Sequence, residues 1–197
     1  MGSIHRIVST EREPVSTVET ELIERIVAGR AEEFSVLVER YQSMVFGMIM
    51  RQVGSRDIAD ELAQETFLRA FQNLDSFRNR SKFSTWLIRI ALNQTSSWFA
   101  SKRFQQARRT VSLDLTAHDR PADGEADTRN REALFLMALG ALAPKFRDVI
   151  TLCGYEGRSY EEAAMILEIP VGTIRSRLNR ARLMLKAEVE RLEGGES

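Results

Sequence analysis

Apolar residues recur at the spacing of an α-helix along nearly the whole chain, and no segment alternates in the manner of a β-strand. The pattern predicts helices near residues 22–27, 34–53, 57–73, 83–101, 129–142, 144–153, 159–166 and 171–192. Four apolar residues of the third helix are expected to point into a core: Leu62, Phe67, Leu68 and Phe71. The fold class is therefore expected to be all-α.

One stretch interrupts this pattern. Residues 107–127 are acidic and turn-prone, contain Pro121 and Gly124, and lack an apolar period, which predicts a flexible acidic linker between two small helical domains. A long ordered surface loop is the alternative. The expected segments are a disordered tail at 1–17, a helical domain at 18–105, the linker at 106–128, a second helical domain at 129–193 and a tail at 194–197.

Composition argues against several classes of protein. The single cysteine, Cys153, excludes a disulfide scaffold, and the two histidines, His5 and His118, are too isolated to form a zinc-type ligand set. No metal or cofactor is therefore expected. No apolar run approaches the ~20 residues of a membrane span, and the N-terminus lacks a signal-peptide core. These features predict a cytoplasmic protein that is not inserted in a membrane.

The net charge of zero, from 28 basic and 28 acidic residues, conceals strong segregation. Residues 76–109 contain eight bases and no acid: Arg78, Arg80, Lys82, Arg89, Lys102, Arg103, Arg108 and Arg109. Residues 171–186 contain five more and no acid: Arg175, Arg177, Arg180, Arg182 and Lys186. An acidic cluster precedes both tracts: Asp57, Asp60, Glu61 and Glu65. Blocks of this kind create local fields, and they predict contact with a polyanion and with a basic protein surface.

The C-terminal tract has the pattern of a helix-turn-helix. Ser159 and Glu162 form a capping-box pair that opens a short helix, and a turn at 167–170 leads into a long basic helix. Four side chains of that helix are expected at the bases of a major groove: Arg175, Ser176, Asn179 and Arg180. Arg177 and Arg182 are expected at phosphates. The alternative is a helical hairpin with a solvated basic face.

The middle tract alternates bases with aromatic residues, among them Phe77, Phe83 and Trp86, as single-strand binding surfaces do. Asn93, in line with Arg89 and Trp86, can hydrogen-bond a base edge. An ordinary aromatic core with a basic rim is the alternative. The acidic cluster, with Gln64, lies largely on one side of its helix and resembles a docking face for a basic protein, although a solvated helix start explains it as well.

Four stretches together resemble the bacterial RNA polymerase sigma-70 superfamily, in particular its extracytoplasmic-function (ECF) group. They are FSVLVERYQSMVF (34–46), DIADELAQETFLRAFQNLDSFR (57–78), KFSTWLIRIALNQ (82–94) and RSYEEAAMILEIPVGTIRSRLNRARLML (158–185). The resemblance implies a sigma region 2-like domain, a helix-turn-helix region 4-like domain, and an alternative sigma factor for transcription initiation that has no enzymatic activity of its own.

The resemblance also implies partners and site residues. Five residues would dock on the clamp helices of the largest subunit of core RNA polymerase, with the flap as a further contact: Asp57, Asp60, Glu61, Gln64 and Glu65. Seven would bind the −10 element of promoter DNA and help to melt it: Phe77, Arg78, Lys82, Trp86, Arg89, Ile90 and Asn93. Six would bind the −35 element: Arg175, Ser176, Arg177, Asn179, Arg180 and Arg182. An anti-sigma factor is the expected regulator.

Two departures from the family pattern bear on specificity. Asn179 stands where relatives often carry a larger residue, and the loop at 79–84 lacks an acid that some relatives have. Two other functions compete with the sigma factor. A helix-turn-helix regulator of duplex DNA would leave the acidic and aromatic helices without a role, and an enzyme acting on nucleic acid would need a metal or general-base set.

Overall fold

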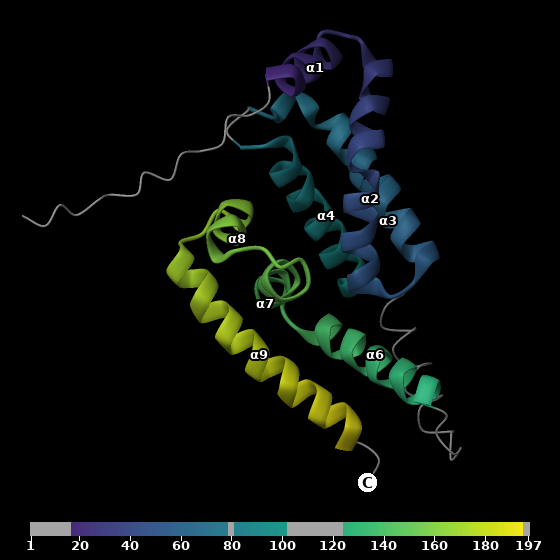
Figure 1. Ribbon diagram of the computed structural model, residues 1–197, viewed down its shortest axis with the longest axis vertical. Helices are drawn as coiled ribbons and strands as arrows, with labels where there is room; N and C mark the ends of the chain where they lie inside the picture. Colours follow the sequence, from purple (N-terminus) through teal and green to yellow (C-terminus); the bar gives the residue numbers. More distant parts are fainter. Residues whose placement is uncertain (1–16, 79–80, 102–123, 195–197) are drawn as a thin grey trace, which may run out of the picture.

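The computed structural model describes residues 17–78, 81–101 and 124–194, and within these ranges every regular element is helical (Figure 1). The first half contains α1 (Thr17–Val27), α2 (Phe34–Val53), α3 (Arg56–Gln72) and α4 (Phe83–Ala100). The second half contains α6 (Gly124–Ala141), α7 (Pro144–Ile150), α8 (Tyr160–Leu167) and α9 (Val171–Glu193). Single turns η1 (Ala31–Glu33) and η2 (Leu74–Ser76) and a π-helical turn η3 (Thr151–Tyr155) connect some of them. The all-α prediction is confirmed.

The N-terminal domain is built on α2, α3 and α4, which pack against one another. Leu37, Ile49 and Leu87 are fully buried among them. The inward prediction for α3 is right for Leu62 and Phe67 and wrong for Leu68 and Phe71, which are 50% and 41% exposed. The buried side of α3 runs instead through small residues such as Ala63 and Ala70, because α2 and α4 approach the helix there.

The C-terminal domain packs α7 and α8 against the long helix α9, with α6 along its other end (Figure 1). The capping box is confirmed: the Glu162 N–H donates to Ser159 Oγ (3.1 Å), and the Ser159 N–H donates to Glu162 Oε2 (2.9 Å). Ala163 and Ala164 are buried where α8 meets α9. Glu168 ends α8 with a left-handed backbone (φ 54°), which starts the turn into α9.

The segment boundaries differ from the expected ones in detail. α1 begins at Thr17, the last residue of the expected tail, and α6 begins at Gly124, inside the expected linker. Glycine is tolerated at a helix start, so it does not terminate the pattern there. Ser55 immediately precedes α3, but its side chain makes no capping hydrogen bond. Residues 106–123 of the expected linker, the tail at 1–16 and residues 195–197 lie outside the described residues.

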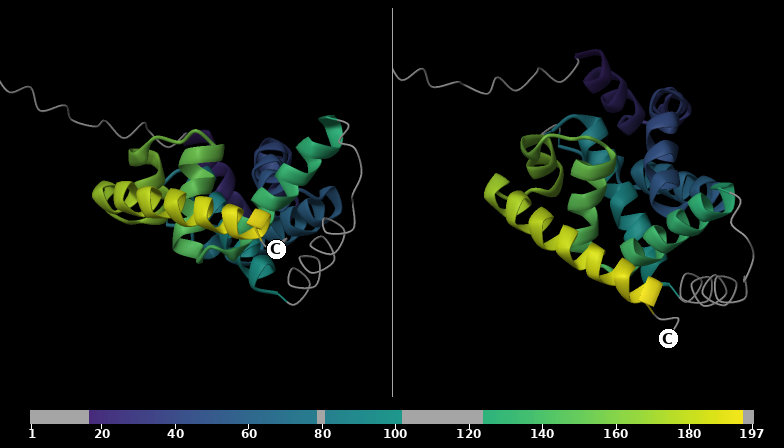
Figure 2. Two further views of the ribbon diagram at one scale, coloured as in Figure 1. Left: turned by 90° about the horizontal axis from the view of Figure 1, so that it is seen from below. Right: turned by 60° about the horizontal axis from the view of Figure 1, so that its bottom comes forward.

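The two domains touch, with α8 lying on α4 and α6 near the end of α2 (Figure 2). Side chains of both domains contribute to this contact. Arg89 of α4 reaches the end of α8, Arg51 of α2 donates to Glu156 (2.6 Å), and the Arg147 guanidinium lies 4.3 Å from the centroid of the Phe99 ring. Gly54 ends α2 with φ 67°, and a Cβ there would lie 2.3 Å from Leu136 of α6.

Candidate nucleic-acid and protein interfaces

The exposed side of α9 carries the residues expected to read duplex DNA. Its buried side is formed by Ile174, Leu178 and Ala181. At about 100° per residue, Ser176, Asn179 and Arg180 lie opposite that side, and all three are exposed. We call these three residues the recognition face. Arg175 is also exposed, on one flank, with its guanidinium 5.9 Å from the Tyr160 ring centroid.

Arg177 and Arg182 occupy opposite flanks of α9 and have different surroundings. Arg177 is partly buried and faces Asp148 of α7. The Oδ1 atom of Asp148 is buried and has no hydrogen-bond partner among the described residues. Burial raises the pKa of Asp148 to about 6, while the nearby charges of Arg147 and Arg177 act in the opposite direction. Arg182 is exposed and lies along the edge of a pocket.

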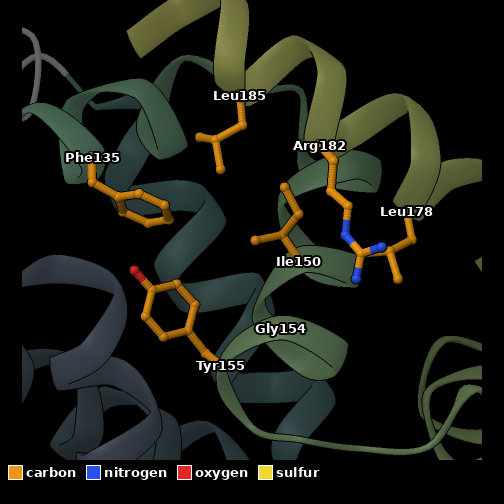
Figure 3. Close-up of a pocket in the computed structure, with 7 residues that line it drawn as sticks. All are labelled: Phe135, Ile150, Gly154, Tyr155, Leu178, Arg182 and Leu185. Atoms are coloured by element: carbon orange, nitrogen blue, oxygen red, sulfur yellow. The ribbon is translucent and has the colours of Figure 1, made fainter.

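That pocket, of about 360 Å³, lies between α6, the π-helical turn η3 and α9. Figure 3 shows Phe135, Ile150 and Leu185 around it, with the Tyr155 ring below and Arg182 at one side. Burial, and to a lesser degree the charge of Glu132, raises the pKa of Tyr155 to about 12, so its hydroxyl is neutral. The pocket is thus an apolar hollow on the side of α9 away from the recognition face, with one cation at its rim.

The residues expected at the −10 element lie on and next to α4, but they are less accessible. Phe77 is buried, and its ring packs against those of Phe83 and Trp86 at 5.7 and 5.3 Å between centroids. The Phe77 ring therefore lies beneath the exposed surface of α4 and packs against it. On α4 itself, Trp86, Arg89 and Ile90 are partly buried and Asn93 is exposed. We call these four residues of α4 the −10 face. Arg78 and Lys82, outside the helix, are exposed.

Arg89 is held by the other domain. Its Nε donates to the carbonyl of Ile166, its Nη2 to the carbonyl of Met165 (2.7 Å), and its Nη1 to Glu168 Oε1 (2.5 Å). The carbonyls at the end of a helix lack partners within the helix, so a cation is favoured there. The structure thus places the principal base of the −10 face against α8.

The acidic cluster lies on α3 as a continuous surface, which we call the acidic face: Asp57, Asp60, Glu61, Gln64 and Glu65. Asp57, Glu61 and Gln64 are exposed. Asp60 is half exposed and lies 3.9 Å from Arg56, whereas Glu65 accepts a 2.7 Å hydrogen bond from Arg69. The negative charge of the cluster is therefore partly compensated by two bases, Arg56 and Arg69, each four residues from its partner.

A groove of about 500 Å³ runs beside this face, between α2 and α3. Val38, Phe46 and Phe67 supply apolar surface, and Asp60 and Gln64 of the acidic face contribute to its lining. An apolar groove with carboxylates at its edge suits a basic, partly apolar protein surface. Gln42 and Ser43 also line this groove. No sequence pattern predicted the groove or these two residues, because the groove forms only where α2 and α3 pack together.

Two further properties concern the described residues alone. No group of three or more His, Cys, Asp or Glu side chains among them is arranged to hold a metal ion. None of the helices in the described ranges combines the length and the apolarity needed to cross a membrane.

Comparison with known proteins gives consistent matches over most of the chain. Residues 37–105 match sigma-70 region 2, and residues 132–185 match sigma-70 region 4. The ECF RNA polymerase sigma-E factor of Haemophilus influenzae is 36% identical over 184 residues, covering 87% of this chain and 95% of that protein. The corresponding factor of Escherichia coli (strain K12) is 38% identical over 184 residues, covering 87% and 94%.

Solved structures agree with these matches. CnrH in complex with the cytosolic domain of CnrY aligns with a TM-score of 0.57 and 27% identity, covering 86% of this chain and 96% of that one. The sigma factor RpoE in complex with the anti-sigma factor NepR from Bartonella quintana aligns with a TM-score of 0.50 and 26% identity, covering 81% and 98%. With two region matches, full-length relatives above 30% identity and a shared fold, the chain belongs to the sigma-70 family, within its ECF group.

Proposed function

We propose that this sigma factor directs transcription initiation through three surfaces. The acidic face and its groove dock on the clamp helices of core RNA polymerase. The −10 face, together with Phe77, Arg78 and Lys82, binds and helps to melt the −10 element. The recognition face, with Arg175 at its leading edge and Arg177 and Arg182 toward the phosphates, binds the −35 element.

The observation that carries this proposal is the acidic face beside the α2–α3 groove. A regulator that binds only duplex DNA has no use for an acidic surface, since it would repel the phosphate backbone. Here the acids lie on a different helix from the recognition face, and the groove next to them provides apolar area for a protein partner. The separation of an acidic surface from a basic one favours a chain that bridges polymerase and promoter.

The apolar pocket between α6, η3 and α9 is the surface we assign to the polymerase flap. It lies on the side of α9 away from the recognition face, so a protein segment can occupy it while DNA is bound. Of the two similar structures, one is the sigma factor RpoE in complex with the anti-sigma factor NepR, and the other is CnrH in complex with the cytosolic domain of CnrY. An anti-sigma factor is accordingly the expected regulator here as well. We assign the chain to the cytoplasm, where it meets polymerase and promoter, and we assign no catalytic step to it.

The test is a charge reversal on the acidic face. The double variant Asp60→Lys/Glu61→Lys should lower affinity for core polymerase by at least about 100-fold, because like charges brought together at an interface cost several kcal/mol. Its stability should change by less than about 1 kcal/mol, because the two side chains are at the surface. Affinity is measured by fluorescence anisotropy of labelled protein, and initiation by transcription from a promoter pool.

The matched control is Glu21→Lys/Glu24→Lys, which reverses two exposed acids of α1 and so makes the same change of net charge on another helix. It should bind core polymerase like the unaltered protein. Equal affinities of the two double variants would show that the acidic face is not the docking surface. Specific −35 binding without any binding to core polymerase by the unaltered protein would instead favour a duplex-DNA regulator.

A further inference from the structure

We propose that the contact between α4 and the end of α8 is an intramolecular latch that closes the −10 face in the free protein and leaves the recognition face open. The latch consists of Arg89, the carbonyls of Met165 and Ile166, and the carboxylate of Glu168. Single-stranded −10 DNA is the ligand that competes with it. The inference rests on the proposed function, because it assigns DNA to the surface that the latch covers.

The geometry of Arg89 is that of a docked residue. Its side chain is 26% exposed, and each nitrogen of its guanidinium group donates to an acceptor of the C-terminal domain. The Glu168 N–H already donates to the Ala164 carbonyl, which leaves the carbonyls of Met165 and Ile166 for Arg89. The arginine therefore caps a helix of the other domain, where the helix dipole also favours a cation.

The position of Arg89 on α4 makes this contact relevant to DNA. Trp86 lies three residues before Arg89 and Asn93 lies four residues after it, so the three side chains share one side of the helix. α8 packs on α4 at the same place (Figure 1). A strand that is to meet Arg89 must therefore displace the end of α8. No element among the described residues covers Ser176, Asn179 and Arg180 in this way, and all three are exposed on α9.

The remaining contacts between the domains indicate an interface that can open. In the Arg51–Glu156 ion pair the arginine side chain is 47% exposed and the glutamate side chain is 11% exposed, and in the latch Glu168 is 72% exposed. Solvent at Arg51 and at Glu168 screens the two pairs, which limits the stability that they add. Arg147, whose guanidinium lies against Phe99, has a buried Nε atom with no hydrogen-bond partner among the described residues. Burying a donor that has no acceptor costs free energy, and this cost opposes closure of the two domains on each other. Phosphate oxygens offer Arg89 an acceptor of the same charge as Glu168, so DNA can compete.

The latch and the neighbouring Arg51–Glu156 ion pair are weakened, without touching a DNA-binding residue, by the double variant Arg51→Ala/Glu168→Gly. Glu168 has φ 54°, a conformation that glycine adopts without strain, so the turn of the helix-turn-helix should remain folded. The control is Arg25→Ala/Glu190→Ala, which removes one base and one acid from ion pairs that stay within a domain, Arg25–Glu33 and Lys186–Glu190. Circular dichroism should show equal helix content in all three proteins.

The first measurement is small-angle X-ray scattering of the free full-length proteins at low salt. We expect the radius of gyration to increase in the latch variant and to stay unchanged in the control. Equal scattering of all three proteins would overturn the latch, whatever the outcome with DNA. This arm does not depend on the proposed function, since it needs neither promoter nor polymerase.

The second measurement is binding of two labelled probes taken from a promoter that the holoenzyme selects from a random pool. One is the single non-template strand of its −10 element, and the other is its −35 duplex. The latch variant should bind the single strand about three- to tenfold more tightly, because the fraction of protein in the competent state rises, and the duplex within about twofold of the unaltered protein. An unchanged single-strand affinity would overturn the proposal. Failure of the holoenzyme to select any promoter would count against the proposed function instead.

Discussion

The two helices assigned to promoter DNA differ in how the fold presents them. The recognition face of α9 lies opposite its own buried side and is exposed in the free chain. The −10 face of α4 includes Trp86, whose ring packs on those of Phe77 and Phe83. It is partly buried except at Asn93, and its arginine is held by α8. Under the proposed roles, the first surface can bind without any rearrangement, whereas the second needs the domains to separate.

The difference follows from what each surface has to recognise. A duplex groove accepts a helix from outside, so a single exposed face is enough. An unstacked strand needs rings and pockets that hold flat bases, and such apolar surface is costly to leave in water. Covering it with the other domain lowers that cost. Substitutions in the two domains test this contrast, beginning with the largest expected effect.

Phe83→Ala should destabilise the N-terminal domain by about 3–5 kcal/mol, because the ring is fully buried and contacts the rings of Tyr41, Phe77 and Trp86. Denaturant unfolding measures the loss. Binding of the −35 duplex at a temperature where the C-terminal domain stays folded should persist. Leu139→Ala, a truncation at a fully buried site of α6, should do the reverse and weaken −35 binding first. If both variants lose duplex binding together, the two surfaces are not independent.

Asp148 lies beneath α9, and the variant Asp148→Asn should remove a pH dependence of the free energy of unfolding. The pKa of Asp148 is raised to about 6 in the folded chain, so the folded protein holds the proton of this carboxyl more tightly than the unfolded chain does. The resulting contribution to the free energy of unfolding is fully present below the unfolded pKa of Asp148 and is lost as pH rises through about 6. The asparagine variant should therefore gain stability relative to the unaltered protein between about pH 4 and about pH 7, by at most about 3 kcal/mol. Urea unfolding of both proteins across this range measures the difference. A constant difference at every pH would mean that Asp148 ionises as freely as in the unfolded chain.

Arg180→Ala should change which −35 sequences are bound, at a cost of about 1–3 kcal/mol at one base pair, because Arg180 belongs to the recognition face. Arg182→Ala should weaken all sequences alike and lower the salt slope by about one, as loss of a phosphate contact does. Binding to a randomised −35 library at two salt concentrations separates the two effects. A uniform loss for Arg180→Ala would make it a phosphate contact, and the exposed face of α9 would then not read bases through this residue.

The sequence predicted the fold closely where local chemistry decides it. The capping box of Ser159 and Glu162 and the helix from Val171 follow from residues within a few positions of one another, and both are as expected. The inward prediction for Leu68 and Phe71 failed because a helical period shows that apolar residues share a side, not which neighbour covers it. The ion pair of Glu65 with Arg69 follows from their spacing of four residues, which places both side chains on the same side of a helix.

The sequence by itself determined the helices, the capping box of α8 and the exposed side of α9, because backbone hydrogen bonds and the 3.6-residue period act over a few residues. Only the tertiary structure decided the state of α4, since Arg89 meets Met165, Ile166 and Glu168, which lie more than 70 positions along the chain. The same holds for the groove beside the acidic face and for the burial of Asp148 below α9. No local pattern encodes these contacts, because they depend on the burial of whole surfaces when helices pack together.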